Sequence, residues 1–251
     1  MKFIIKEHDK INEFIELIKF MKNLSQYTTM MCNSEDIHIQ LLDDSHVSLL
    51  DIHIPCDWFE TYECDEPHTF SVSNIILSKL FALYTKDSIM ETEIDEEKYH
   101  LSYLNDKDNK YFTICLIDID KDLLSPVIQE TDLDFSLNTS LFETYLNDLS
   151  IFGEDLEITC NNDTLYLTTE GDEGNMKIEI SVKSLIQFNV IDDYEFHCKY
   201  ASKYLQYISK LKKNYKNIHL YLDANSPLLI TFDNENGIKI NYFIAPKINE
   251  D

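Results

Sequence analysis

This chain of 251 residues contains no arginine, and all 21 of its basic residues are lysines. The guanidinium fork of arginine makes the commonest specific contact with guanine, so its absence argues against sequence-specific DNA binding. The 46 acidic residues give a formal net charge of −25. Such a charge argues against a protein that holds nucleic acid on a broad basic face.

Glycine and proline are also scarce. Four glycines and five prolines exclude a collagen-like or low-complexity chain. No apolar run approaches the roughly 20 residues that a bilayer span requires, and the lysines at positions 2 and 6 leave no room for a signal peptide. We therefore expect a soluble chain with no membrane partner.

Hydrophobic residues make up 44% of the chain and aromatic residues 12%, which indicates a packed core. The length suits one large domain or two domains of about 125 residues each. Six cysteines lie at wide, irregular spacing, at positions 32, 56, 64, 115, 160 and 198. We expect them to be reduced thiols in a cytosolic or nuclear compartment.

Apolar side chains recur at helical spacing in four places, two in each half of the chain. These patterns predict helices near residues 9–21, 72–85, 140–152 and 201–213. In the first, the apolar face comprises Ile11, Phe14, Ile15, Ile18 and Met21, and the polar face comprises Asn12, Glu13, Glu16 and Lys19.

Alternating runs predict strands at 37–41, 89–94, 99–104 and 111–117, and again at 156–160, 218–222, 228–232 and 238–244. The order of helices and strands is therefore repeated. Between the repeats lies an acidic segment that contains Pro126, which is typical of an exposed connector. We predict domains at 1–119 and 135–251, with a connecting loop at 120–134.

Two separated segments carry a family resemblance. Residues 43–50 form a turn followed by an alternating strand, and residues 242–247 form an apolar strand that stops at a proline. Both resemble segments of the eukaryotic and archaeal sliding clamp, the proliferating cell nuclear antigen (PCNA) family. Similar stretches follow in the same order at 60–65, 117–120, 149–153 and 226–228, so the resemblance covers essentially the whole chain.

The resemblance implies an α+β DNA-clamp fold, with two similar domains that each place two helices on antiparallel β-sheets. It implies a homotrimeric ring that joins strands 110–116 and 175–182 of neighbouring copies. The function would be that of a processivity factor for DNA polymerase in replication and repair. The ring would encircle double-stranded DNA and be loaded by an ATP-dependent clamp loader. The location would be the nucleus, or a cytoplasmic viral factory for a viral chain.

The resemblance also implies a hydrophobic surface that binds PCNA-interacting peptides as a helical turn in a groove. Any one of its residues, taken alone, is more simply explained as part of a strand or of the core. The surface would comprise Leu42, His46, Val47, Leu49, Leu123, Leu124, Val127, Pro227, Phe243, Ile244, Ala245 and Pro246.

Lysines on the channel helices are implied to contact phosphates without reading bases. They are Lys19, Lys79 and Lys210, which match family positions, and Lys203, Lys212 and Lys213, which compensate for basic residues that this chain lacks. The helix expected at 140–152 has no basic residue, so direct contact with DNA should be weak and sensitive to salt. Asn162 stands where eukaryotic relatives place a modifiable lysine, which argues against ubiquitin attachment there.

Other interpretations of the residues remain open. His53, Cys56, Cys64 and His68 form a possible zinc pattern with unusual spacing, and acidic pairs at 118/120 and 132/134 would suit a two-metal nuclease. We favour neither, and we expect no enzymatic activity, metal or cofactor, since motifs for nucleotide binding and for nucleophilic catalysis are missing. Within the clamp class, the alternative is a subunit of a heterotrimeric checkpoint-type clamp or a viral clamp homologue used in transcription.

Overall fold

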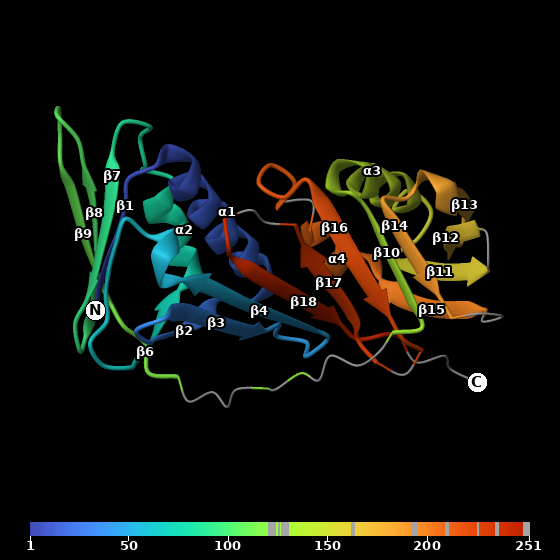
Figure 1. The fold of residues 1–251 in the computed structure, drawn as a ribbon, viewed down its shortest axis with the longest axis horizontal. Coiled ribbons are helices and arrows are strands. Elements are labelled where there is room, and N and C mark those ends of the chain that lie inside the picture. The colour runs from blue at the N-terminus through green and yellow to red at the C-terminus, as the bar shows by residue number, and fades with distance from the viewer. Residues whose placement is uncertain are drawn as a thin grey trace. The chain divides into compact units, whose positions relative to one another are not determined.

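The computed structural model describes residues 1–119, 124, 126, 131–161, 164–191, 195–208, 211–224, 226–233 and 236–247. Its helices and antiparallel sheets form the predicted α+β clamp fold (Figure 1). The chain divides into two compact units. The first comprises Met1–His46, Leu50–Leu124 and Asn234–Ile240, and the second comprises Val47–Leu49, Ser125–Asp233 and Asn241–Asp251.

The first unit contains two sheets. One has the strand order β5-β1-β7-β8-β9, and in the other β4, β3, β2 and β6 follow one another. The first five strands in that order are β5 (Thr61–Glu63), β1 (Lys2–Ile5), β7 (Ile89–Ile94), β8 (Lys98–Leu104) and β9 (Lys110–Cys115). The others are β4 (Ser48–Pro55), β3 (Asp36–Leu42), β2 (Tyr27–Cys32) and β6 (His68–Ser73).

Helices α1 (His8–Leu24) and α2 (Asn74–Phe81) pack against each other in this unit. The predicted apolar face of α1 is buried, and each of its five apolar residues is at most 4% exposed. Burying this stripe against the sheets stabilises the helix far more than its intrinsic propensity does.

The prediction for the polar face of α1 was wrong at one residue. Glu13 is only 3% exposed, and its Oε2 accepts a hydrogen bond from Nδ2 of Asn236 at 3.2 Å. A buried carboxylate needs a partner, and here the amide lies 223 residues away in the chain. Local periodicity cannot reveal such a partner.

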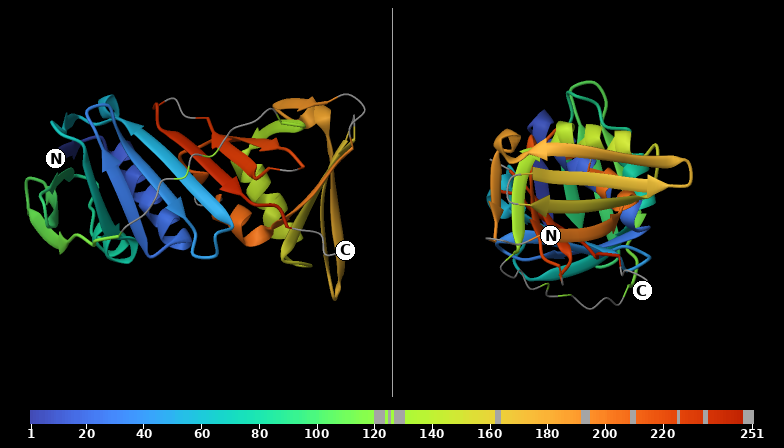
Figure 2. Two further views of the ribbon diagram at one scale, coloured as in Figure 1. Left: turned by 90° about the horizontal axis from the view of Figure 1, so that it is seen from below. Right: turned by 90° about the vertical axis from the view of Figure 1, so that its right-hand side faces the viewer.

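The second unit repeats this arrangement. One sheet has the order β13-β12-β11-β15, and in the other β14, β10, β16, β17 and β18 follow one another. The right-hand view of Figure 2 shows the strands of the four-stranded sheet side by side. The strands are β13 (Gly174–Ser181), β12 (Thr164–Gly171), β11 (Asp155–Asn161), β15 (Phe196–Ala201), β14 (Gln187–Val190), β10 (Leu133–Asn138), β16 (Asn217–Leu222), β17 (Leu228–Phe232) and β18 (Lys239–Ile244).

Helices α3 (Thr139–Leu149) and α4 (Ser202–Ile208) pack together on this unit. The side chain of Asn138 caps α3 by accepting hydrogen bonds from the backbone N–H groups of Ser140 and Leu141. Short 3₁₀ turns follow β4 at Cys56–Trp58 and β13 at Val182–Ser184.

The helix limits differ from those predicted. The pattern at 140–152 yields α3 over Thr139–Leu149, and residues 150–152 form a turn. The pattern at 72–85 yields α2 over Asn74–Phe81, because Val72 and Ser73 belong to β6 and the Ser73 hydroxyl caps the helix. Within the pattern at 201–213, the structure describes α4 over Ser202–Ile208 and a turn over Leu211–Asn214, and residues 209 and 210 lie outside the described part of the chain. None of the described helices has the length and apolar character needed to cross a membrane.

Candidate functional site

Two strands offer long open sheet edges, one in each unit. The strands with a hydrogen-bonded neighbour strand on one side only are β5, β6 and β9 in the first unit and β13, β14 and β15 in the second, whereas β4 and β18 have neighbours on both sides. β5 and β14 have three and four residues, whereas the edge of β6 is bridged by Ile117 and that of β15 by Lys247. Among the described residues, β9 with six residues and β13 with eight therefore remain as long uncovered edges. Such edges expose backbone groups that pair readily with another strand.

The direction of the free backbone groups on β9 follows from its register. Lys98 lies opposite Cys115, and Leu116 N donates to Glu97 O at 2.8 Å, so Leu116 and Glu97 form a hydrogen-bonded pair. Hydrogen-bonded pairs alternate along an antiparallel ladder. The N–H and C=O groups of Tyr111, Thr113 and Cys115 therefore point away from β8, toward the free edge.

Strand β13 shows the same alternation of exposed side chains. Asn175, Lys177, Glu179 and Ser181 are exposed, and the residues between them are half-buried or buried. Lys177 Nζ lies 3.6 Å from the ring centroid of Tyr166 on β12, within the distance of a cation–π contact. The strands predicted for the ring contact, 110–116 and 175–182, lie on β9 and β13.

The predicted DNA-contacting lysines of the first unit lie on its paired helices. Lys19 is exposed on α1, where its Nζ lies 2.9 Å from Oε1 of Glu16, one turn earlier. Lys79 is exposed in the last turn of α2, and the described residues provide no ion-pair partner for it. A phosphate must therefore compete with Glu16 for Lys19, whereas Lys79 has no such competitor.

In the second unit, the corresponding lysines surround α4 and the turn that follows it. Lys212 Nζ lies 2.5 Å from Oε2 of Glu143 on α3, so this lysine is already neutralised. Lys203 Nζ lies 4.6 Å from the ring centroid of Tyr204, and Lys213 is exposed. The predicted contact at Lys210 lies outside the described residues.

The segment from Asp43 to Val47 forms a tight turn. Asp43 accepts from the backbone N–H of Ser45 through its carboxylate and from that of His46 through its carbonyl, both at 2.9 Å. His46 has a φ of 58°, in the left-handed region, which suits the end of such a turn. Val47 O then accepts from the backbone N–H of Ala245 at 2.8 Å, which joins this segment to the residues that follow β18.

Gln40 binds the backbone of Leu124 in the connector. Leu124 N donates to Oε1 of Gln40 at 2.7 Å, and Nε2 of Gln40 donates to Leu124 O at 2.8 Å. These two bonds fix the Leu124 backbone, and 48% of the residue's surface stays exposed. Sequence reasoning missed Gln40, although its glutamine amide on the polar face of a predicted strand was a usable signal.

The predicted peptide-binding residues differ in their accessibility. Leu42, His46, Val47, Leu124, Pro227, Ala245 and Pro246 are half-buried or exposed, whereas Leu49, Phe243 and Ile244 are buried. Ile244 is completely buried, so its side chain supports the strand instead of offering a contact surface. Leu123 and Val127 lie outside the described residues.

The structure does not assemble the zinc pattern that the spacing suggested. Among the described residues, the one group of three or more metal-ligand side chains is His38, Asp51 and His53, so Cys56, Cys64 and His68 do not join His53. In the acidic pairs, Asp134 accepts from Asn189 Nδ2 at 2.8 Å and Asp132 from Ala224 N at 3.2 Å. Asp120 lies outside the described residues.

Comparisons with known proteins agree over most of the chain. The family model "Proliferating cell nuclear antigen, N-terminal domain" matches residues 10–123, and the C-terminal domain model matches residues 128–247. Proliferating cell nuclear antigen 2 of Drosophila melanogaster is 25% identical over 239 residues, which cover 94% of both chains. Proliferating cell nuclear antigen of Saccharomyces cerevisiae is 26% identical over 257 residues, with 95% of each chain covered.

The fold itself is also similar to a solved structure. The crystal structure of proliferating cellular nuclear antigen from Entamoeba histolytica superposes with a TM-score of 0.88. The superposition covers 98% of each chain at 23% identity.

Proposed function

Because this chain belongs to the proliferating cell nuclear antigen family of sliding clamps, we propose that three copies close into a ring around duplex DNA and act as a processivity factor for DNA polymerase. The observation that carries the proposal is the pair of long open edges, β9 in one unit and β13 in the other. Pairing β9 of one copy with β13 of the next satisfies both edges. This contact is heterologous, and it closes into a ring when the rotation between copies is right.

We assign the inner wall of this ring to the lysine-bearing helices. Lys19, Lys79, Lys203, Lys210, Lys212 and Lys213 would meet phosphates, and no arginine is present to read bases. Glu16 and Glu143 already neutralise two of these lysines, so their contact with DNA is weak. Retention on DNA then depends on encirclement, because a closed ring cannot leave without opening.

One substitution tests the role of the Lys212–Glu143 pair. Glu143→Gln releases Lys212 for a phosphate, so the affinity for a short duplex should rise several-fold at low salt. The slope of log K against log salt should steepen by about 0.9 for each further phosphate that a lysine neutralises. Asp148→Asn is the matched control, since it removes one negative charge from the same helix. Fluorescence anisotropy at four salt concentrations measures both variants, and an equal rise in affinity in both would show a general charge effect instead.

We assign the docking of partner proteins to the surface residues that the sequence predicted, and chiefly to their accessible members. Leu124 offers an exposed apolar side chain on a backbone that Gln40 fixes. Partners would insert a helical turn with aromatic anchors, as DNA polymerases and other replication proteins do through PCNA-interacting peptides. The domain limits that we propose are 1–119 and 135–251, with a connecting loop at 120–134 whose last two residues, Leu133 and Asp134, already belong to β10. We also propose that the protein acts in the nucleus.

The function is tested by DNA synthesis on a primed circular template with a replicative polymerase, a clamp loader and ATP. Addition of the protein should lengthen the products of single binding events, and omission of the loader should abolish that effect. A chain that stays monomeric and inactive until different clamp subunits are added would support the heterotrimeric alternative. Incubation of DNA with the protein and magnesium or manganese tests nuclease activity, and we expect no cleavage.

A further inference from the structure

Strands β3 and β4 are neighbours in the sheet and carry their polar side chains on one face. Side chains alternate between the two faces of a strand. On β3, Ile37, Ile39 and Leu41 enter the core, so His38 and Gln40 occupy the other face. On β4, Leu50, Ile52 and Ile54 are completely buried, so Asp51 and His53 occupy that same outer face.

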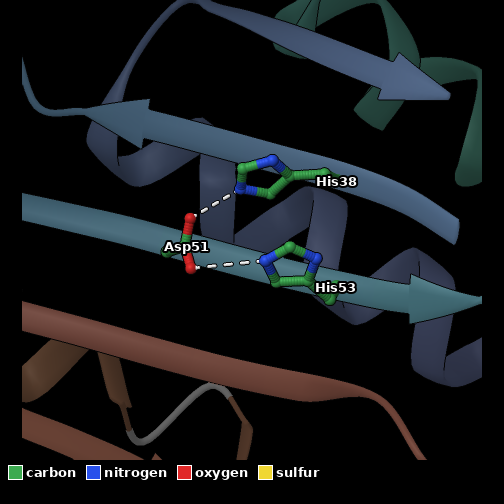
Figure 3. Close-up of side chains that lie close together, drawn as sticks. All are labelled: His38, Asp51 and His53. Carbon is green, nitrogen blue, oxygen red and sulfur yellow. Dashed lines mark hydrogen bonds and ion pairs between the residues drawn. The ribbon is translucent and has the colours of Figure 1, made fainter. Parts of the chain in front are cut away.

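Three ionisable side chains of this face, His38, Asp51 and His53, converge (Figure 3). His38 Nε2 lies 2.7 Å from Asp51 Oδ1, and His53 Nε2 lies 3.7 Å from Asp51 Oδ2. The two imidazole rings are nearly parallel, with centroids 4.1 Å apart. The carboxylate therefore has one imidazole nitrogen at each oxygen.

A second set of groups orients these three side chains. His53 Nδ1 lies 2.7 Å from Asp36 Oδ2, which favours a proton on Nδ1 and leaves Nε2 directed at Asp51. Gln40 Nε2 donates to Asp51 Oδ1 at 3.2 Å. Burial opposes ionisation of Asp51, but hydrogen bonds from His38 and Gln40 and the nearby imidazoles outweigh it and lower the pKa of Asp51. The carboxylate is thus ionised at neutral pH.

We propose that His38, Asp51 and His53 form a binding site for a divalent transition-metal ion of the zinc class. The ligand atoms all lie within 4.8 Å of one another. Ligand atoms of tetrahedral zinc lie about 2.0–2.2 Å from the ion and therefore about 3.3 Å from one another. The distance from Asp51 to His38 Nε2, 2.7 Å, is below that value, and the distance from Asp51 to His53 Nε2, 3.7 Å, is above it. The ion replaces the His38–Asp51 hydrogen bond, the proton of His38 Nε2 leaves to solvent, and rotations of the two rings bring both Nε2 atoms to the ion. Water completes the coordination.

The hydrogen-bond partner of His53 is one that a metal-binding histidine usually has. Such a histidine usually donates its other ring N–H to a carboxylate or carbonyl, which fixes the tautomer and raises ligand basicity. Asp36 serves His53 in this way. Imidazole nitrogens favour zinc, cobalt, nickel and copper over magnesium and calcium, so selectivity for the first group is expected.

The rest of the described chain offers useful controls. His197 lies beside Glu157, and His219 lies beside Asp233, each as one imidazole with one carboxylate. Neither pair has a second imidazole within reach, because the described residues contain one cluster of three ligands. If any histidine–carboxylate pair could bind Zn²⁺, these two pairs would bind it as well. If three ligands are needed, only the cluster of His38, Asp51 and His53 would bind it.

The experiment uses the full-length protein after treatment with a chelator. Calorimetric titration should show one Zn²⁺ per chain, and Mg²⁺ should give no signal. The double variant His38→Gln/His53→Gln should weaken Zn²⁺ binding by more than about 100-fold. This loss exceeds the one that is typical when only a hydrogen-bond partner of a metal ligand is removed. The matched variant His197→Gln/His219→Gln should bind as the wild type does.

Titration with Co²⁺ identifies the ligands. A site of two imidazoles and a carboxylate gives visible d–d bands without thiolate charge-transfer absorption, whereas binding by the six cysteines would add that absorption. If the double variant does not fold, His53→Gln alone serves, because 38% of the His53 side chain is exposed. Circular dichroism of the metal-free variants confirms the fold. Absence of stoichiometric Zn²⁺ binding, unchanged affinity in the His38/His53 variant, or thiolate absorption would each overturn the proposal.

Discussion

Replacing Thr113 by proline is expected to convert a trimer of about three times 29.6 kDa into single folded chains. The backbone N–H of Thr113 points away from β8, so the proline removes a donor from the free edge and leaves the β8–β9 ladder intact. Its ring also blocks the approach of a neighbouring strand. Light scattering after size exclusion gives the mass, and loss of the ring should abolish stimulation of the polymerase.

Thr113→Val is the matched control for this experiment, because it keeps the N–H and suits an edge strand. It should remain trimeric. The melting temperature of the proline variant, measured at equal chain concentration, separates dissociation from unfolding. A trimeric Thr113→Pro protein, or equal dissociation of both variants, would show that β9 is not the ring edge.

The second large effect concerns partner peptides. Leu124→Asp should weaken binding of a peptide with one helical turn and aromatic anchors by roughly 10- to 100-fold. This factor corresponds to the loss of about 1.5–3 kcal/mol from burying a leucine side chain. Fluorescence anisotropy with a labelled peptide measures the change. Because 48% of Leu124 is exposed, the substitution should leave the fold and the trimer unchanged.

Leu83→Asp provides a closely matched control. Leu83 follows α2 and is 47% exposed, so the two substitutions change similar surfaces by the same chemistry. Peptide affinity should be unaltered in this variant. An equal loss in both, or no loss in Leu124→Asp, would remove Leu124 from the docking surface. Ile244 is unsuitable for this test because it is buried, and a polar residue there would destabilise the core.

Local pattern located some of the strands well, because side-chain alternation and burial have the same period. The predicted strands 89–94 and 228–232 coincide with β7 and β17. Helix limits were less predictable, since tertiary pairing decides them. Val72 fits a helical pattern, but it pairs with Thr28 on β2, which keeps it in a strand.

Features that depend on distant partners could not be predicted from the sequence. The buried Glu13 accepts a hydrogen bond from Asn236, which is distant in the sequence. Gln40 likewise forms a hydrogen bond with Leu124, and these residues are 84 positions apart. The alternation of residues 37–41 places His38 on the polar face of a strand, but its meeting with Asp51 requires the pairing of β3 with β4. The open edges of β9 and β13 likewise follow from the whole strand order.

The proposed ring explains how so acidic a chain could function on DNA. Direct contact relies on a few lysines, two of which face a glutamate of their own chain. Such contact is weak and falls steeply with salt. The proposed closed ring would not need such contact, since the DNA would pass through its centre.

The most direct test therefore loads the protein onto nicked circular DNA with a clamp loader and removes free protein in high salt. The protein should remain on the circles and should leave after a restriction enzyme linearises them. Blocking the new ends with bound protein should prevent that loss. Release from intact circles by salt, or retention on linear DNA with open ends, would contradict encirclement.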